Sequence, residues 1–584
     1  MEQYKYYTDE VNTQILIALL KAHNIKRVIV SPGATNTALV GSMQHDNFFE
    51  MYSCVDERSA AYMACGMAEE SGEPVILSCT GATSSRNYMP GLTEAFYRKL
   101  PILAVTSSME SNRLGHLYAQ FTDRSTPPSD CVKKTYLIQS IKDQEDYWDC
   151  TVKTNDAILE LTHGIPGPIH INLERIYSNV FPVKELPKAT VIKRFETIAA
   201  NDTIPQGRIG VFIGQHKKMT EEETTIIDEF CVKYDAILLA DKTSGYHGNY
   251  SYASALLTTQ EGLDNNLVTF DLLIHIGEIS GEYYTLGSIK PKEVWRVARD
   301  GIIRDRFRKL TRVYQMDEKT FFRCFSEKKT NESTKNINNW EKRYAFVKQN
   351  IPDIPFSTIW IAKVLANEIP SGSILYLSIL NVLRAWNFFE TDKIIDIVSN
   401  VGGFGIDGMT SSLIGASLIN PQRLCFGITG DLNFFYDLNA LGNRHVGSNV
   451  RILLINNGHG QEFRTYKHGA NLLGNEVEPY ISAAGHFGNK SAVLVKNLAE
   501  NLGYKYITAS DKKEFMDIYP TFATSEQVDS PIIFEVFTEN DNEHDSLKLI
   551  RNILPKTVES KIKDTAKSIL GSNGIKFVKK IVGK

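Results

Sequence analysis

The sequence lacks the cysteine patterns of disulfide-rich and zinc-binding proteins. Its 584 residues include eight scattered cysteines, and no two of them form a Cys-x-x-Cys pair. Closely spaced cysteine pairs are typical of structural zinc sites, and disulfide frameworks are typical of small secreted domains. We therefore expect reduced thiols.

Long apolar runs and a strong excess of one charge are also missing. No apolar run is long enough to cross a bilayer, and the N-terminal stretch is polar, without a signal-peptide core. The formal net charge is −4, which gives no general attraction to nucleic acid or to an anionic membrane. We predict a cytoplasmic protein without nucleic-acid partners or stable membrane insertion.

The composition is that of a soluble globular protein with several domains. Apolar residues make up 42% and charged residues 23% of the chain. A chain of this length is too long for one hydrophobic core. Alternating strand and helix patterns predict α/β domains at residues 1–180, 195–325 and 340–545, with polar linkers at 181–194 and 326–339. Residues 546–584 form a basic tail with helical spacing of apolar residues. We expect it to be a helix that packs on its own protein, or else one that lies on a membrane surface.

One strand–helix–strand pattern in the third predicted domain carries oxygen-bearing side chains. The strands Leu424–Thr429 and Val450–Ile455 flank a predicted helix at Phe434–His445, and Asp431 and Asn457 follow the two strands. The carboxyl ends of parallel strands are where α/β sheets bind ligands. If the strands are neighbours, both oxygens reach one Mg²⁺ ion. The alternative is an ordinary βαβ unit with a capping Asp and an Asn-Asn-Gly turn.

The first predicted domain also places small residues and a carboxylate after its strands. The strand Arg27–Ser31 runs into a Pro-Gly turn, and Pro74–Cys79 runs into a Thr-Gly turn before a helix. Glu57 follows the strand Met51–Val55, and by itself it could be a carboxylate that stabilises a helix N-terminus. The turn residues are Pro32, Gly33, Thr80 and Gly81.

Three motifs together resemble those of one enzyme family. SPGATNTAL (31–39), VDERSAAYMACGMAEESGEPV (55–75) and GDL…NN (430–457) are similar to thiamine-diphosphate enzymes of the decarboxylase and acetolactate-synthase type. SNVGGFGIDG (399–408) and GDLNFFYDLNAL (430–441) are similar to the menaquinone-pathway synthase that adds a succinyl-semialdehyde unit to isochorismate. The resemblance implies three doubly wound parallel-sheet α/β domains: pyrimidine-binding, central and diphosphate-binding.

The resemblance also implies roles for the motif residues. Thiamine diphosphate supplies an electron sink for carbanion chemistry. Glu57 would hydrogen-bond the aminopyrimidine ring and help to activate the cofactor. The Asp431 and Asn457 side chains and the His459 backbone carbonyl would bind Mg²⁺, and Ile406 would support the bent cofactor, although it could also be plain core. Further predicted cofactor contacts are Pro32, Gly33, Thr80, Gly81, Gly403, Gly405, Gly430 and Leu432.

On the substrate side the match is incomplete. Thr35, Val401 and Met109 stand where the menaquinone-pathway synthase has arginines that would grip carboxylates. Arg384 and Gln120 do match family positions, and we predict that they contact the donor.

Two further residues are acid–base candidates. His116 shares a polar loop with Gln120, and Glu462 follows the predicted metal turn. Imidazole titrates near neutral pH, so His116 could relay a proton, or it could be a surface histidine. Glu462 could move protons or be a surface helix residue.

The predicted function is Mg²⁺- and thiamine-diphosphate-dependent decarboxylation of a 2-oxo acid. The product is either a free aldehyde or the result of transfer to an aldehyde or ketone acceptor. We expect a homodimer or homotetramer with active sites at the subunit interface. The alternatives are the menaquinone-pathway synthase using 2-oxoglutarate and isochorismate, an acetolactate-synthase-like enzyme with FAD in its central domain, and a non-catalytic homologue. No GxGxxG loop follows the strand Ile209–Ile213 of that domain.

Overall fold

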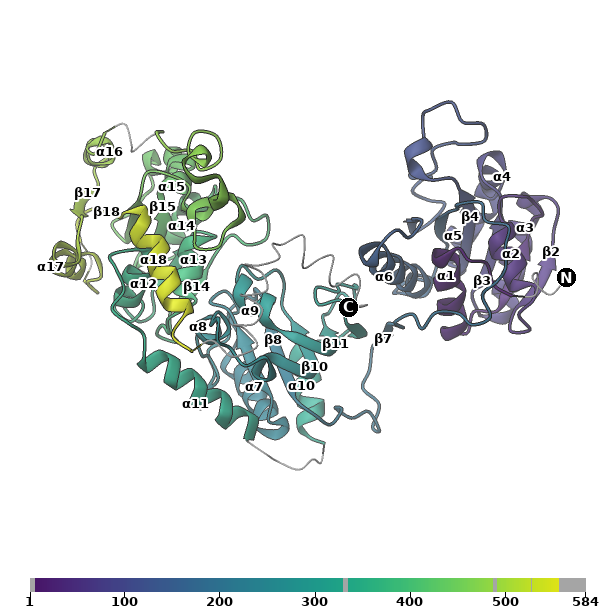
Figure 1. Cartoon of the computed structure of the whole chain (residues 1–584), viewed down its shortest axis with the longest axis horizontal. Helices are drawn as coiled ribbons and strands as arrows, with labels where there is room; N and C mark the ends of the chain where they lie inside the picture. The colour runs from purple at the N-terminus through teal and green to yellow at the C-terminus, as the bar shows by residue number, and fades with distance from the viewer. Residues whose placement is uncertain (1–5, 329–334, 487–490, 527, 556–584) are drawn as a thin grey trace, which may run out of the picture. The chain divides into compact units, whose positions relative to one another are not determined.

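A computed structural model describes residues 6–328, 335–486, 491–526 and 528–555. The chain divides into two compact units (Figure 1). The N-terminal unit extends to Thr197 and includes Asp300–Gln315, and the C-terminal unit comprises Ile198–Arg299 and the chain from Met316 onward. Among the described helices, none has the length and apolar character to span a bilayer.

The N-terminal unit is built on a six-stranded parallel sheet of order β2-β1-β3-β4-β6-β5. A short parallel pair, β7 with β12, belongs to the same unit. The strands are β1 (Arg27–Val30), β2 (Glu50–Ser53), β3 (Val75–Cys79), β4 (Ile102–Ser108), β5 (Lys134–Ile138), β6 (Ile169–Glu174), β7 (Lys193–Phe195) and β12 (Leu310–Tyr314). The helices are α1 (Val11–Ala22), α2 (Thr37–Met43), α3 (Glu57–Ser71), α4 (Ala82–Asn87), α5 (Met89–Arg98), η2 (Ser111–Arg113) and α6 (Gln144–Glu160).

Two apolar clusters cover the two faces of this sheet. Val28 in β1 packs into one cluster with α1 and α6, whereas the next residue, Ile29, packs into the other with α3 and α5. The reason is that successive side chains of a strand point to opposite faces. Because helices cover both faces, the sheet is doubly wound, and an inner strand such as β3 is buried along its whole length.

The C-terminal unit contains two parallel sheets in succession. The first has the order β11-β10-β8-β9 and the second β14-β13-β15-β16-β18-β17. The first is formed by β8 (Ile209–Ile213), β9 (Ile237–Ala240), β10 (Thr269–Ile276) and β11 (Lys290–Val297), with α7 (Glu221–Tyr234), α8 (Ser254–Thr258), η3 (Asn265–Val268), α9 (Tyr283–Ser288) and α10 (Glu318–Ser326). The second is formed by β13 (Ile374–Leu377), β14 (Asp396–Val398), β15 (Cys425–Gly430), β16 (Val450–Asn456), β17 (Lys505–Ala509) and β18 (Ile532–Phe537). Its helices are α11 (Lys335–Gln349), α12 (Thr358–Leu365), α13 (Asn381–Trp386), α14 (Met409–Ile419), α15 (Asp431–Tyr436), η4 (Leu438–Gly442), η5 (Gln461–Arg464), η6 (Gly469–Val477), α16 (Leu494–Asn501), α17 (Lys512–Phe522) and α18 (Asn540–Arg551).

The three sheets repeat one winding order. In each, the first strand lies between the second and the third: β1 between β2 and β3, β8 between β9 and β10, and β13 between β14 and β15. The chain therefore reverses its winding direction beside β1, β8 and β13. Such switch points open a crevice at the carboxyl ends of the strands, where ligands bind in α/β folds. The predicted fold class, three doubly wound parallel-sheet domains, is confirmed.

The predicted helix at Phe434–His445 is wrong in extent. Helix α15 begins at Asp431, directly after β15, and ends at Tyr436, and a separate 3₁₀ segment follows at Leu438–Gly442. Helix α11 begins at Lys335, inside the predicted linker 326–339. The domain boundaries at 180, 195, 325, 340 and 545 stay predictions.

The predicted C-terminal tail is described only in part. Helix α18 reaches Arg551, and the apolar residues Leu547, Ile550 and Leu554 are buried. The side chain of Gln260 accepts hydrogen bonds from the backbone N–H groups of Ile553 and Leu554. This part of the tail packs on its own unit, and residues 556–584 lie outside the described residues.

Candidate active site

Asp431 and the turn after β16 meet at the carboxyl end of the third sheet. Strands β15 and β16 are parallel neighbours, with Gly430 paired to Ile455. The Asp431 carboxylate accepts a hydrogen bond from the Gly458 N–H at 2.6 Å. The predicted neighbourhood of the two strands is therefore correct, and the carboxylate lies against the turn that contains Asn457.

The local chemistry of this turn suits a divalent cation. Asp431 is 6% exposed, and burial raises its pKa to about 6 although backbone N–H groups of Leu432, Gly458 and Asn457 oppose the rise. Among the described residues no Lys, Arg or His forms an ion pair with Asp431. A buried carboxylate without a cation is costly, and hard oxygen ligands with few protein contributions suit Mg²⁺. The residues present fit the metal that the sequence predicts.

The side chain of His459 makes polar contacts with two other side chains. Its Nδ1 lies 3.1 Å from Glu478 Oε2, and its Nε2 lies 3.2 Å from Gln461 Oε1. These contacts fix the ring, and the role of the His459 backbone carbonyl at a cation stays a prediction. Asn457 is half-buried, and its Oδ1 lies 3.4 Å from the backbone N of His459.

The glycine-rich loop before α14 is open. Gly403 and Gly405 are exposed, Ile406 is half-buried, and Phe404 between the glycines has a φ of 55°. A positive φ in an aromatic residue is uncommon and often marks a functional loop. Ile406 is thus not an ordinary core residue in this chain, which is consistent with its predicted role beside the cofactor.

Glu57 begins helix α3 in the N-terminal unit. Asp56 is the N-cap, and its carboxylate accepts from the Arg58 N–H at 3.0 Å. Glu57 is therefore not needed as the cap. It is half-buried, and its Oε2 accepts a hydrogen bond from Asn87 Nδ2 at 3.5 Å. The carboxylate remains available for a ligand at this edge of the first sheet.

The two predicted turns of the N-terminal unit lie side by side. They follow β1 and β3, which flank the switch point of the first sheet. A Cβ atom on Gly33 would come within 2.0 Å of Thr80 Cγ2, and one on Gly81 within 2.9 Å of the Ser107 carbonyl. No residue larger than glycine fits at Gly33 without moving the Thr80 side chain. Pro32, beside Gly33, is exposed.

Arg124 is a residue of this edge that sequence reasoning missed. It donates hydrogen bonds to Thr106 Oγ1 at 3.1 Å and to the Ser107 carbonyl at 2.9 Å. Its guanidinium lies against Gly81, and burial lowers its pKa. The only available signal was a lone arginine in a polar loop. His116 and Gln120 in the same loop are exposed, and Gln120 has a φ of 63°.

Arg384 and Glu462 form a buried ion pair in the C-terminal unit. Arg384 Nη2 donates to both carboxylate oxygens of Glu462, at 3.0 and 2.9 Å, and Nη1 donates to Asn381 Oδ1 at 2.9 Å. The Arg384 side chain is 9% exposed and that of Glu462 19%. Burial would lower the pKa of Arg384, but the charge of Glu462 offsets it, and the net pKa is raised.

Helix α13 presents Arg384 at the switch point of the third sheet. It follows β13, the strand between β14 and β15, and Leu380 at its N-cap has a φ of 67°. This strained residue lets a six-residue helix begin abruptly at the strand end. Glu462 lies on η5, directly after the predicted metal turn. The fold thus brings together the predicted donor contact and one predicted acid–base residue.

Two of the three positions that depart from the arginine pattern, Val401 and Thr35, take part in the packing and hydrogen bonding of the fold. Val401 is 2% exposed, and the Thr35 carbonyl accepts a hydrogen bond from Arg175. Arg175 is itself paired with Glu10 at 3.1 Å, and both side chains are 1% exposed. Arg175 therefore supports the turn after β1, and its charge is already neutralised by Glu10.

Comparisons with known proteins agree with this geometry. The domain described as "Thiamine pyrophosphate enzyme, N-terminal TPP binding domain" matches residues 12–126. The 2-succinyl-5-enolpyruvyl-6-hydroxy-3-cyclohexene-1-carboxylate synthase of Phocaeicola vulgatus is 30% identical and covers 92% of this chain and 97% of its own length. The chain belongs to the thiamine pyrophosphate enzyme family. Synthases of the same name from two other organisms are further relatives. The Bacteroides fragilis protein is 29% identical and covers 93% of this chain and 98% of its own length. The Flavobacterium johnsoniae protein is 28% identical and covers 90% of this chain and 96% of its own length.

Membership of this family confirms the main functional predictions. The protein is a thiamine-diphosphate-dependent enzyme of 2-oxo acid decarboxylation and carboligation. Its cofactors are thiamine diphosphate and a divalent metal ion, typically Mg²⁺. These are the cofactors that the sequence predicts. The roles of individual residues stay predictions.

Proposed function

We propose that the donor of this thiamine pyrophosphate enzyme is a 2-oxo acid with a small, uncharged side chain. The observation that carries the proposal is the ion pair of Arg384 with Glu462. A carboxylate tail on the donor would have to displace Glu462 and leave its charge buried and unpaired. Breaking a fully buried ion pair costs about 3–5 kcal/mol, and the cost here is lower because the Glu462 side chain is 19% exposed.

Arg384 can still contact such a donor. Its Nε–H and one Nη1–H make no hydrogen bond to a described residue. These groups suit a neutral oxygen such as a carbonyl or hydroxyl. A hydrogen bond from Arg384 to a neutral oxygen stabilises the bound donor less than a hydrogen bond to a carboxylate would. It does not require Glu462 to be displaced. Gln120 is proposed as the second donor contact.

The residues of the two units divide the work on the cofactor. Thiamine diphosphate supplies the carbon nucleophile and the electron sink. We propose that Asp431, Asn457 and the His459 carbonyl hold Mg²⁺ at the diphosphate end, and that Glu57 exchanges a proton with the aminopyrimidine. Gly33 and Gly81 let backbone approach the ring closely. His116 stays a secondary proton-transfer candidate, and Glu462 is assigned first to neutralising Arg384.

We further propose a cytoplasmic homodimer or homotetramer in which each cofactor lies between two subunits. The pyrimidine-side residues belong to the N-terminal unit and the metal residues to the C-terminal unit. In the proposed assembly, Glu57 of one chain and Asp431 of another serve one site. A closed two-fold arrangement then repeats the site without leaving half-sites exposed.

A second candidate is the reaction of the curated relatives. Similarity over nine-tenths of the chain to 2-succinyl-5-enolpyruvyl-6-hydroxy-3-cyclohexene-1-carboxylate synthases favours it. In that case the proposed donor is 2-oxoglutarate and the proposed acceptor isochorismate. Thr35, Val401 and Met109, in place of arginines, and the neutralised Arg384 speak against this pair of highly charged substrates.

One assay separates the two candidates. We would measure CO₂ release by the holoenzyme from pyruvate, 2-oxobutyrate and 2-oxoglutarate, alone and with aldehyde acceptors or isochorismate, and identify products by mass spectrometry. The proposal expects kcat/KM for the uncharged donors to exceed that for 2-oxoglutarate by at least about tenfold, the equivalent of one charged contact. Efficient joining of 2-oxoglutarate to isochorismate would establish the second candidate instead.

A further inference from the structure

Arg124, a cation at the carboxyl end of the first sheet, has no carboxylate partner among the described residues. Its pKa is lowered by burial, which the Cys79 thiol opposes and the positive charge of Arg86 reinforces. An arginine nevertheless stays charged at any physiological pH. The charge of Arg124 therefore needs a counter-ion that the described chain does not supply.

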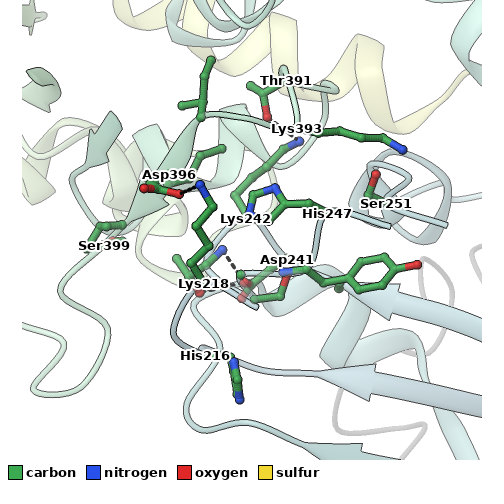
Figure 2. Close-up of a pocket in the computed structure, with 18 of the residues that line it drawn as sticks. His216, Lys218, Asp241, Lys242, His247, Ser251, Thr391, Lys393, Asp396 and Ser399 are labelled. Carbon is green, nitrogen blue, oxygen red and sulfur yellow. Dashed lines mark hydrogen bonds and ion pairs between the residues drawn. The ribbon is translucent and has the colours of Figure 1, made fainter. Parts of the chain in front are cut away.

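A cation at the carboxyl end of each of the other two sheets is paired with a carboxylate. Lys218, in the loop after β8, contacts Asp396 at 2.6 Å in the cavity shown in Figure 2. Arg384, after β13, is held by Glu462. Charges that are partly removed from water are normally paired. The exception at Arg124 therefore indicates an anion that a ligand brings.

The guanidinium of Arg124 is fixed by the ends of two strands, β4 and β6. Its Nη1 donates to Thr106 Oγ1 at 3.1 Å, and its Nη2 donates to the Ser107 carbonyl at 2.9 Å. The Thr106 hydroxyl, which is buried, also lies 2.8 Å from His170 Nε2 and donates to Asn172 Oδ1 at 3.2 Å. The Asn172 amide in turn donates to the Arg124 carbonyl at 3.3 Å. This loop residue is thus preorganised, which lowers the entropic cost of binding a ligand.

Arg124 keeps hydrogen-bond donors for a ligand. Its two contacts use one N–H on Nη1 and one on Nη2. The Nε–H and the second N–H of each terminal nitrogen make no hydrogen bond to a described residue. The side chain is half-buried, and its Nε is not enclosed by the described residues. Paired N–H donors of this kind suit the two oxygens of a carboxylate.

Arg124 also lies beside residues that are proposed to contact the cofactor. A Cβ atom on Gly81 would come within 3.4 Å of Arg124 Nη1, so the guanidinium packs on the backbone of this turn. Burial raises the pKa of the Cys79 thiol to about 12, and two nearby charges act on it as well, Glu57 upward and Arg124 downward. Cys79 is the last residue of β3. The cation and the carboxylate proposed to activate the cofactor therefore share one strand end.

We propose that Arg124 binds the carboxylate of the acceptor, and that the acceptor is an aldehyde or ketone acid. The donor's own carboxylate is a poorer ligand, because a cation that held it would stabilise the bound acid against the loss of CO₂. The carboxylate of an acceptor does not change in the reaction. A contact to it therefore orients the acceptor carbonyl without opposing any step. The inference rests on the proposed function, because it takes pyruvate as the donor.

Assays of the full-length holoenzyme with pyruvate and matched acceptors test the contact. Glyoxylate is paired with acetaldehyde, and 5-oxopentanoate with pentanal, so that each pair has the same chain length and only one member carries a carboxylate. In at least one pair, kcat/KM for the charged acceptor should exceed that for the neutral one by at least about tenfold. Arg124→Met should lower this ratio about ten- to hundredfold, mainly through KM, and Arg124→Lys, which keeps the charge, should preserve part of it.

Binding without turnover gives a second measurement. Calorimetry of the holoenzyme without donor uses pentanoate as the probe and pentanamide as its neutral counterpart. Arg124→Met should weaken the binding of pentanoate about tenfold or more and leave that of pentanamide unchanged. Arg98→Met is the matched control, because Arg98 is an exposed arginine of the same unit that is paired with Glu69 at 2.9 Å. It should behave as the wild type does in both experiments.

The outcomes separate this inference from the proposed function. Wild type that prefers neutral acceptors, or releases free aldehyde with every acceptor, would overturn the inference. An acceptor ratio that is unchanged in Arg124→Met would overturn it as well, even if the enzyme prefers uncharged donors. A changed KM for pyruvate with an unchanged acceptor ratio would place Arg124 at the donor instead. If 2-oxoglutarate proves to be the better donor, the proposed donor is wrong, and the same acceptor pairs then test Arg124 with 2-oxoglutarate.

Discussion

The guanidinium of Arg384 is held by both carboxylate oxygens of Glu462, 78 residues later in the chain, at 3.0 and 2.9 Å. The chain thereby neutralises a cation that could otherwise have bound an anionic substrate. Arginine forks hold carboxylates by paired donors, and here the paired acceptor is internal. The proposed choice of donor depends on this one contact.

Removing the charge of Glu462 should change which donors the enzyme accepts. In Glu462→Gln the side chain keeps its size, but Arg384 regains an uncompensated charge. We expect kcat/KM for 2-oxoglutarate to rise by about ten- to hundredfold relative to pyruvate, the value of a charge-assisted hydrogen bond. Steady-state assays with both donors measure the ratio.

Arg384→Ala is the complementary change. It should raise the KM for donors with an oxygen-bearing tail and leave pyruvate almost unaffected. Because Glu462 then loses its partner, thermal unfolding should be followed in the same preparation, and Arg384→Ala/Glu462→Ala removes both charges together. If the two variants treat tailed and untailed donors alike, Arg384 does not contact the donor.

Asp431→Asn should abolish Mg²⁺-dependent binding of thiamine diphosphate. The amide keeps the shape and one of the two oxygens that accept from the Leu432 and Gly458 N–H groups, but it removes the negative charge that attracts the cation. Calorimetric titration of cofactor with and without Mg²⁺ gives the affinity. The exposed Asp517 on α17 offers a control, and Asp517→Asn should bind as the wild type does. Equal affinity in Asp431→Asn would remove Asp431 from the metal site.

Glu57→Gln should keep the fold and slow cofactor activation. Asp56, not Glu57, caps helix α3, so the helix should survive the change. General acid–base help is worth about 10²–10⁴-fold, and the exchange rate of the cofactor's C2 proton should fall by that amount. Proton exchange followed by NMR measures it directly. A wild-type exchange rate in the variant would contradict the assigned role.

Mixing two inactive variants tests the shared site. Glu57→Gln and Asp431→Asn chains, denatured together and refolded, should recover about a quarter of wild-type activity, because half of random dimers carry one intact site of two. Each variant refolded alone should stay inactive. Absence of recovery, with mixed dimers verified by mass spectrometry, would mean that each chain builds its own site.

The order of apolar and turn residues along the chain predicted many of the strands and helices. Apolar runs bounded by turn residues located strands such as β8, predicted at its observed bounds, because burial on both faces demands continuous apolar sequence. The same patterns missed β5 and β17, whose residues are partly exposed and therefore mixed in polarity. Helix α15 ends early at Tyr436 although the apolar pattern continues, because the backbone there turns into a 3₁₀ segment.

Asp431, Asn457 and Thr80 could be chosen from sequence because each directly follows a strand, and strand ends converge in a parallel sheet. Only the tertiary structure decided the partners of polar side chains. The pairing of Arg384 with Glu462 and the contact of Arg124 with Gly81 join segments far apart in the chain. Side-chain hydrogen bonds and ion pairs act over a few ångströms in space. The separation of two residues along the sequence does not show whether their side chains meet.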